Sequence, residues 1–232
     1  MRVSINQPAF FPWLGYFHRI AISDKHVVLD HVQFEKNSYV NRNKIKTPNG
    51  GLWVTVPLIT SGKFGDLAIN KIEVANISSW QKKIIESVKQ FYRKAPYFND
   101  YFPFLEDTFY NHEWVQLNDL MKHLNQYFLQ ALDINTPIVY STDMNVDGAK
   151  SDLVLKHCQA LNCSTYISGP FGKDYLDKEA FSQNNIDVIY HEYQHPVYPQ
   201  LHGDFIPNLS VVDLLMNCGT ESKEILMLNT HQ

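Results

Sequence analysis

The sequence predicts an α/β fold built on a mainly parallel, Rossmann-like sheet with flanking helices. Two observations support this prediction. β-Branched segments alternate with helical patterns through the last third of the chain, and the first thirty residues show the same order of strand, loop, helix and strand. Strands that alternate with helices form βαβ units, whose strands lie parallel in one sheet. The 232 residues contain no internal repeat or linker-like tract, so we expect one α/β domain over residues 1–232.

The first part of the chain predicts a strand-loop-helix-strand unit followed by a hairpin. β-Branched residues mark its strands, and apolar residues at spacings of three and four mark its helix. The turn sequence Pro-Asn-Gly-Gly at residues 48–51 precedes the clearest alternating segment of the chain and predicts the hairpin. The expected elements are a strand at 3–5, a helix over 16–22, a strand over 26–30, a hairpin over about 39–58 and a strand-like segment over 69–74.

A helical insertion over about residues 78–135 is expected before the chain returns to the sheet. Ser79 starts a helix whose apolar residues recur at helical spacing, and Pro96 and Pro103 end it. A second helix is expected over about 114–132, where apolar residues mark one face. The remaining elements are a strand at 137–140, a helix over 151–161, a strand at 165–168, a helix over 177–183 and a strand at 186–190.

Composition and charge narrow the function classes. A formal net charge of -4 at pH 7 argues against a protein that binds nucleic-acid backbones, which attract clustered basic residues. Charged residues make up only 19% of the chain and aromatic residues 13%, and many of the aromatic residues follow predicted strands. No apolar run reaches the length of a signal peptide or a membrane span, and three scattered cysteines fit a reducing compartment. We therefore expect a cytoplasmic protein.

The segment His-Glu-Tyr-Gln-His at residues 191–195 matches a zinc-protease pattern. That pattern holds zinc because a helix places both imidazoles on one face. Here the segment follows a predicted strand and is closed by Pro196 and Pro199, so we expect a histidine pair at a strand end and no metal. Metal-dependent hydrolysis at this segment is kept as a third reading. The sequence has no nucleophile elbow, Walker loop or dinucleotide-binding glycine motif.

Three polar and aromatic segments lie where predicted strands end, which is the edge at which open α/β sheets bind ligands. The first, residues 7–16, combines aromatic rings with two prolines and a glycine, and the second supplies a carboxylate, amides and an arginine. The third contains His195, whose imidazole titrates nearest neutral pH and is the candidate for proton transfer. The candidate site residues are Gln7, Trp13 and Tyr16, then Asp30, Gln33, Asn41 and Arg42, and finally Tyr175, His195 and Gln200.

Rare aromatic and amide positions in these segments resemble the WbqC-like family, and the likeness spans nearly the whole chain. The motifs that carry it are Gln7-Pro-x-Phe-Phe-Pro-x-x-Gly-Tyr16, Leu29-Asp30-x-Val-Gln33, Asn41-Arg42-Asn43, Trp53-x-Thr-Val-Pro57, Lys94-Ala-Pro-Tyr97, His195-x-x-Tyr-x-Gln200 and Leu209-Ser-x-x-Asp-Leu-Leu-x-Asn-x-Gly219. The resemblance implies a product of bacterial surface-polysaccharide loci. It also implies transfer of an acyl or aminoacyl group to the amine of a nucleotide-linked amino sugar.

A fainter resemblance, to the nucleotidylyltransferase and pantothenate synthetase group, rests on residues 11–16 and 28–34. In that group the first loop carries paired histidines, which this chain lacks, and Tyr16 stands where the second would fall. This resemblance implies a nucleotidylyltransferase-like (HUP) fold with a nucleotide-shaped pocket, but not adenylyl transfer in the usual manner.

The leading reading is therefore an acyl or aminoacyl transferase of polysaccharide (O-antigen type) synthesis. His195 would deprotonate the sugar amine and Asp30 would orient it. No cofactor is required, and the acyl donor would be a thioester of coenzyme A or of a carrier protein. The expected partners are the nucleotide-linked sugar and such an acyl or aminoacyl carrier protein, without nucleic acid.

The remaining candidate residues would bind the sugar nucleotide. Its diphosphate or sugar would be held by Gln33, Asn41 and Arg42, and Trp13 or Tyr16 would stack on a base or pyranose ring. The alternative reading is a non-catalytic protein that binds a nucleotide sugar or acts as a scaffold in glycan assembly. That reading needs the aromatic and amide groups but not the histidine base.

Overall fold

The computed structural model describes residues 1–62, 67–77 and 79–228. Within these residues, five strands form one parallel sheet in the order β5-β2-β1-β6-β7. The strands are β1 (Arg2–Asn6), β2 (Lys25–Val28), β5 (Ile138–Tyr140), β6 (Thr165–Ser168) and β7 (Asp187–Tyr190). When only the five strands of this sheet are numbered in chain order, their order across the sheet is 3-2-1-4-5. This is a Rossmann-like arrangement, as predicted from the sequence.

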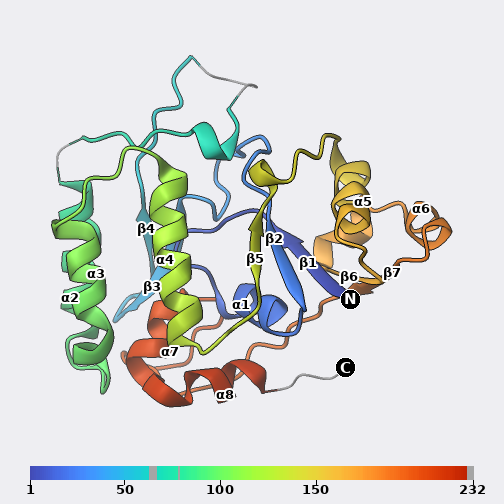
Figure 1. The fold of residues 1–232 in the computed structure, drawn as a ribbon. Helices are drawn as coiled ribbons and strands as arrows, with labels where there is room; N and C mark the ends of the chain where they lie inside the picture. The colour runs from blue at the N-terminus through green and yellow to red at the C-terminus, as the bar shows by residue number, and fades with distance from the viewer. Residues whose placement is uncertain (63–66, 78, 229–232) are drawn as a thin grey trace.

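Helices cover both faces of this sheet (Figure 1). One side carries α5 (Lys150–Ala160) and α6 (Lys178–Gln183), and the other carries α1 (Leu14–Ala21) and the long insertion between β2 and β5. In β1, Val3 and Ile5 belong to the apolar core shared with α5, whereas Ser4 hydrogen-bonds to His26, whose ring contacts α1. Because side chains alternate along a strand, β1 supplies both layers.

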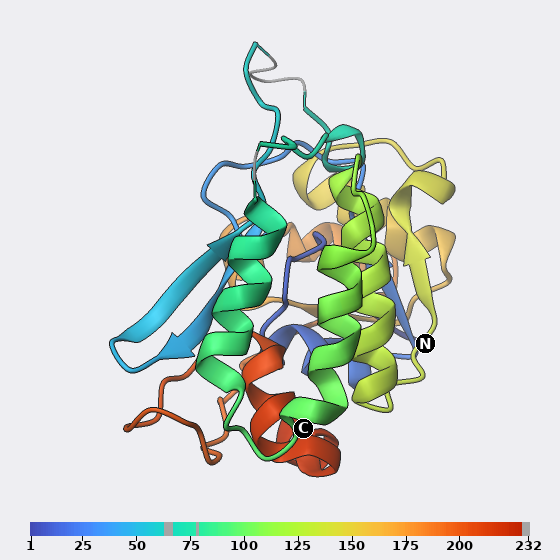
Figure 2. The ribbon, with the colours of Figure 1, turned by 90° about the vertical axis from the view of Figure 1, so that its left-hand side faces the viewer.

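The insertion between β2 and β5 contains the predicted hairpin and helices. The strands β3 (Arg42–Thr47) and β4 (Gly50–Thr55) pair antiparallel, and Figure 2 shows them projecting from the body beside α2. The helices that follow are α2 (Trp80–Tyr92), α3 (Phe98–Tyr110) and α4 (Leu117–Ala131). Their apolar faces join α1 and α7 (Val211–Cys218) in the larger of the two hydrophobic cores found among the described residues.

The prediction that Pro103 ends a helix is wrong, because Pro103 lies inside α3. A proline within a helix removes one backbone hydrogen bond and costs roughly 3 kcal/mol. Phe102, Leu105 and Phe109 are buried along α3. Burial of each such side chain contributes about 1.5–3 kcal/mol, so their packing outweighs the cost of the proline.

The strand expected over residues 69–74 is also absent. The structure has a 3-10 turn, η1 (Ile69–Lys71), followed by isolated bridges from Glu73 and Val74. The N–H of Ile69 and of Asn70 bond to loop carbonyls instead of to a neighbouring strand. Residues 72–75 exchange backbone hydrogen bonds with residues 57–59 on one side and 115–117 on the other, but these contacts are isolated bridges and form no regular strand. The β-branched residues that suggested a strand are buried there as loop anchors.

The last helices, α7 and α8 (Ser222–Met227), close the lower end of the fold (Figure 1). Ser210 caps α7 by accepting a hydrogen bond from the N–H of Val212. Asp213 on α7 accepts hydrogen bonds from the hydroxyls of Tyr92 and Tyr198 at 2.8 and 2.9 Å. This buried network joins α7 to α2 and to the segment after β7. Among the residues described, no helix is both long and apolar enough to cross a bilayer.

Candidate ligand-binding site

A cavity of about 870 Å³ opens at the carboxyl ends of β1 and β6. These strands are neighbours, but the chain continues from β1 toward β2 and from β6 toward β7, in opposite directions along the sheet. Such a topological switch point leaves a crevice in which open α/β sheets bind ligands. The wall includes Asn6 from β1, Arg19 from α1, Ser168 from β6, and His191 and Tyr193 from the segment after β7.

Arg19 places a positive charge in this wall. Its side chain is only 6% exposed, and within the described residues no carboxylate pairs with it. Its Nε is buried without a hydrogen-bond partner, and its guanidinium lies so close to Gly169 that a Cβ there would collide with Nη1. Burial lowers the pKa of Arg19, and nearby tyrosine rings act in the opposite direction. An arginine stays charged in proteins, and a buried charge without a partner is costly, so the arrangement fits an anionic ligand.

Two histidines form a hydrogen-bonded pair beside Arg19. His18 Nδ1 and His191 Nε2 are 2.7 Å apart, and both rings contact the ring of Tyr193. Burial lowers the pKa of His18 to about 4. Burial, His18 and Arg19 together lower the pKa of His191 to about 3. The pair is therefore neutral near pH 7, with one proton shared between the two facing nitrogens.

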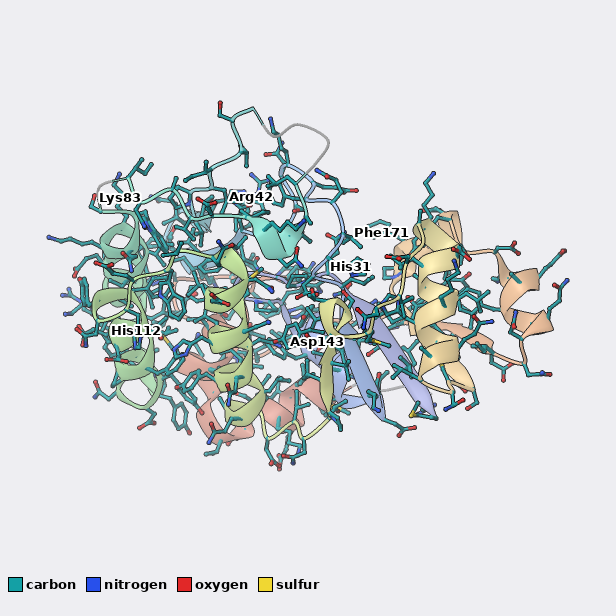
Figure 3. All side chains as sticks on the ribbon, turned by 45° about the horizontal axis from the view of Figure 1, so that its top comes forward. His31, Arg42, Lys83, His112, Asp143 and Phe171 are labelled. Atoms are coloured by element: carbon teal, nitrogen blue, oxygen red, sulfur yellow. The ribbon has the colours of Figure 1, made fainter. Side chains whose placement is uncertain are left out.

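Aromatic rings form another part of the wall. Trp13 and Tyr39 both line the cavity, with ring centroids 5.1 Å apart, and Tyr39 is 41% exposed. Tyr175 and Phe171 line it from the segment after β6, and Figure 3 labels Phe171 above the strands of the sheet in that view. Phe171 is 79% exposed, which is unusual for a large apolar ring without a partner. The cavity therefore combines a buried cation with flat apolar surfaces.

The structure brings two of the predicted site residues, Trp13 and Tyr175, into this wall. Gln7 follows β1 directly and is half-buried, but it is not part of the wall. Tyr16 is 2% exposed and packs edge-on against Trp13, so its ring supports the wall from behind instead of facing the cavity.

Asp30, predicted to orient the sugar amine, is fully buried at the other end of the edge, beyond β2. Its carboxylate accepts hydrogen bonds from Ser141 Oγ, from Asn118 Nδ2, and from both the N–H and the hydroxyl of Thr142. Burial acts to raise the pKa of Asp30, but the hydrogen bonds from Thr142, Asn118 and Ser141 outweigh it, and the pKa lies below its ordinary value. The carboxylate joins β2 to the turn η2 (Ser141–Asp143) and does not line the cavity.

The polar residues predicted to hold a diphosphate lie around the hairpin. Gln33 and Asn41 hydrogen-bond to backbone groups of neighbouring loops. Arg42 donates to a backbone carbonyl and lies 4.4 Å from the ring centroid of Trp53. None of the three is in the cavity wall.

His195, the predicted base, faces away from the cavity. Its Nδ1 donates to the carbonyl of the next residue at 2.9 Å, its ring contacts Phe205, and burial lowers its pKa. Gln200 binds the backbone N–H and carbonyl of Ile206 through its amide. Both residues thus fasten the segment between β7 and α7, and neither lines the cavity.

Residues 191–195 have no helical turn, as the flanking prolines predicted. His191 bonds to His18, and Glu192 pairs with Lys173 at 2.5 Å on the surface. Across the described residues, no group of three histidine, cysteine, aspartate or glutamate side chains is placed to hold a metal ion.

The sequence reasoning did not single out Arg19 or His18. Both lie in the helix predicted over residues 16–22, which was assigned from its apolar residues. The sequence nevertheless contains a signal for these two polar residues. His18 and Arg19 interrupt a segment, residues 14–21, whose other residues are aliphatic, aromatic or glycine, so these two side chains have no polar face of the helix to occupy. A helix of this kind directly after the first strand and its loop indicates that its polar side chains face a ligand or a buried network.

Comparison with known proteins agrees with the motifs quoted above. The model of the WbqC-like protein family matches residues 7–225, a span that includes Arg19, Ser168 and His191. A relative from Mycobacterium tuberculosis (strain ATCC 25618 / H37Rv), Uncharacterized protein Rv1507c, is 31% identical over 228 residues, which cover 97% of this chain and 97% of the relative. No solved structure matches the chain. The chain therefore belongs to the WbqC-like protein family.

Proposed function

We propose that this protein is a transferase of bacterial surface-polysaccharide (O-antigen type) synthesis that places an acyl or aminoacyl group on the amine of a nucleotide-linked amino sugar. The sugar nucleotide would occupy the cavity at the ends of β1 and β6. A volume of about 870 Å³ lies within the range of about 300–1,000 Å³ that is typical of small-molecule sites.

Arg19 is the observation that carries this proposal. A guanidinium that is 6% exposed, without a carboxylate partner in the described chain, needs an anion to offset its lost hydration. Its planar donor group matches phosphate oxygens in pairs, which makes a diphosphate a better match than a neutral sugar. The position at a topological switch point is where nucleotide ligands of open α/β sheets place their phosphates.

The aromatic wall supports a ligand with flat faces beside that charge. Trp13 and Tyr39 offer ring surfaces to a base or to the apolar face of a pyranose. Besides Arg19, the charged residue of the described wall is Glu192, whose carboxylate is paired with Lys173. With one cation free of such a pair among these described residues, the cavity suits one anionic group attached to neutral rings instead of a polyanion.

The proposed chemistry is attack by the neutral sugar amine on the carbonyl of a thioester. A C–N bond forms, the C–S bond breaks and a thiolate leaves; a base accepts the proton of the amine and passes it to the thiolate, so that the products are an amide and a thiol. His191 is the base in this proposal because it lines the cavity and is oriented by its hydrogen bond to His18. The donor would be a thioester of coenzyme A or of a carrier protein, and no cofactor is needed.

A second candidate function is binding of the nucleotide sugar without turnover. The low pKa values of His18 and His191, about 4 and 3, favour it, because such imidazoles are weak bases near neutral pH. This candidate keeps the role of Arg19 and the aromatic wall and gives the protein a carrier or scaffold role in glycan assembly.

The test has a binding stage and a turnover stage. UDP- and dTDP-linked amino sugars should raise Tm, because they bind only the folded protein, whereas the free sugars should not. Incubation with acyl-coenzyme A or acyl-carrier thioesters should then give an amide product, detected by mass spectrometry. Arg19→Gln should lose both responses, and Arg93→Gln, at the exposed end of α2, serves as the matched control. Binding without any amide product would favour the second candidate, and no Tm shift with any sugar nucleotide would contradict both.

A further inference from the structure

The hydrogen-bonded His18–His191 pair can accept one proton but not two. In the neutral pair one proton lies between His18 Nδ1 and His191 Nε2. When His191 Nε2 donates that inner hydrogen bond, His191 Nδ1 keeps a lone pair, which can take a proton while the inner bond survives. A second added proton would leave hydrogens on both facing nitrogens, only 2.7 Å apart, and would break that bond.

Arg19 is one of the groups that keep this pair neutral in the free protein. Burial is the largest cause of the low pKa of His191, and the charges of His18 and Arg19 add to it. Arg19 and His191 line the same cavity, so an anion in contact with the guanidinium also faces His191. Such an anion cancels the repulsion from Arg19 and attracts a proton to the pair.

We propose that Arg19 and the His18–His191 pair form one phosphate-binding unit, in which the pair takes up a single proton when the diphosphate of a nucleotide sugar binds at Arg19. The inference rests on the proposed function and adds to it the ligand group that Arg19 contacts and a linkage to protons. The proton comes from solvent during binding. During transfer near neutral pH, a pair that is still unprotonated in the complex accepts the proton of the sugar amine, and its raised pKa makes it a stronger base. A pair that has already taken a proton from solvent cannot act as the base.

Other ionisable groups near the pair change little between pH 5 and pH 8. They are Arg19, Tyr16, His26, Tyr166, Tyr175, Tyr193 and the Lys173–Glu192 ion pair. Burial raises the pKa of each of these tyrosines and lowers the pKa of His26 to about 3. The hydrogen bond and charge of Lys173 lower the pKa of Glu192, which therefore stays ionised. His195 contacts the far side of the Tyr193 ring and does not line the cavity.

Isothermal titration calorimetry tests the linkage directly. The probe is UDP-N-acetylglucosamine, with dTDP-glucose in parallel, because their diphosphate diesters do not titrate between pH 5 and pH 8. Each titration is run in two buffers with different enthalpies of ionisation, which yields the number of protons taken up. The two rings have pKa values of about 4 and about 3 in the free protein. If binding raises the pKa of the pair to about 6, uptake is about 0.7 proton at pH 5.5 and near zero at pH 8. Kd then falls about fourfold from pH 8 to pH 5.5.

Three variants assign the effect to its residues. His191→Asn keeps a hydrogen-bonding side chain that cannot titrate, and it should abolish both the uptake and the pH dependence of Kd. His112→Asn is the matched control, because His112 is exposed and Figure 3 shows it on the α2–α3 side of the molecule. Arg19→Gln should weaken binding at least about tenfold at both pH values, with partial recovery in Arg19→Lys. Circular dichroism confirms that each variant is folded.

Several results would overturn this inference. They are binding of the probes without proton uptake, uptake that persists in His191→Asn, affinity that does not change in Arg19→Gln, or no binding of either probe by the wild-type protein. The proposed transfer is judged separately by the amide product. Proton-linked binding without an amide product supports this inference and contradicts the proposed transfer. An amide product without proton-linked binding supports the transfer and contradicts this inference.

Discussion

Under the proposed function, a single buried side chain, Arg19, links the stability of the free protein to ligand binding. The energy of a buried charge depends on its partners, and no carboxylate of the described residues pairs with Arg19, so the proposal gives that role to the ligand. The residue types at strand ends predicted an aromatic pocket, and Trp13 and Tyr175 do line it. The predicted polar residues do not line the cavity. Loops also need amides and carboxylates as hydrogen-bond partners for their own backbone groups, as Asp30 and Gln200 show. Sequence alone cannot separate these two uses of a polar side chain.

Arg19→Met should therefore stabilise the free protein while weakening ligand binding at least about tenfold. Methionine keeps the apolar stem of the side chain and removes a charge that has no partner in the described chain. The free energy of unfolding should rise by about 1–2 kcal/mol, by analogy with the replacement of buried charges by apolar residues. For a chain of this size that corresponds to an increase in Tm of about 2–8 °C, measured by differential scanning calorimetry without ligand. A lower Tm than that of the wild-type protein would show that Arg19 holds the fold together instead.

At the scale of elements, local signals predicted most of the strands and helices, and long-range packing decided the rest. The hairpin turn and the β-branched strands follow from short-range rules, and they are present in the structure. Helix α3 was missed because Pro103 is an unfavourable local signal that only the packed core overrides. The turn η3 (Pro170–Asp174), which follows β6, could not be assigned a role from sequence. Its importance lies in how closely its preceding residue, Gly169, approaches a side chain from α1.

Gly169→Ala should weaken nucleotide-sugar binding with little change in stability. The backbone at Gly169 has a φ of -67°, which alanine adopts without strain, but the added Cβ would collide with the end of the Arg19 side chain. The guanidinium would move, and we expect Kd for UDP-N-acetylglucosamine to rise about tenfold while Tm changes by less than about 3 °C.

A double-mutant cycle distinguishes this displacement from a direct effect on the ligand. In the Arg19→Met background there is no guanidinium to displace, so Gly169→Ala should have no further effect on Kd. If the effects of Gly169→Ala and Arg19→Met on the free energy of binding were additive, the proposed contact between residue 169 and the Arg19 guanidinium would be contradicted.

At the scale of the whole molecule, the site depends on contacts that no local pattern reveals. β1 pairs with β6 across about 160 residues of sequence, and this pairing creates the crevice in which Arg19 and His191 meet. The alternation of strands and helices predicted the parallel sheet, but the strand order, and with it the switch point, appears only when the chain is folded. Folding also buries several histidines in their neutral form. The stability of the folded protein therefore depends on pH.

Stability should fall as the pH decreases from 8 to 5, and buried histidines should cause much of the fall. His26 is 0% exposed, and burial followed by the charge of Arg19 lowers its pKa to about 3 from an ordinary value of 6.5. Below pH 6.5 the unfolded chain binds a proton at this residue and the folded protein does not, so stability is lost progressively until the pH reaches the folded pKa. At pH 5 this linkage amounts to about 2 kcal/mol for His26, and His18 and His191 act in the same direction. Asp30 contributes nothing in this window, because its lowered pKa places its loss of stability below pH 4. The measurement is Tm between pH 8 and pH 5. His26→Asn should reduce the change of Tm with pH, and the exposed control His112→Asn should not. An equal change of Tm with pH in the wild-type protein and both variants would contradict the assignment to His26.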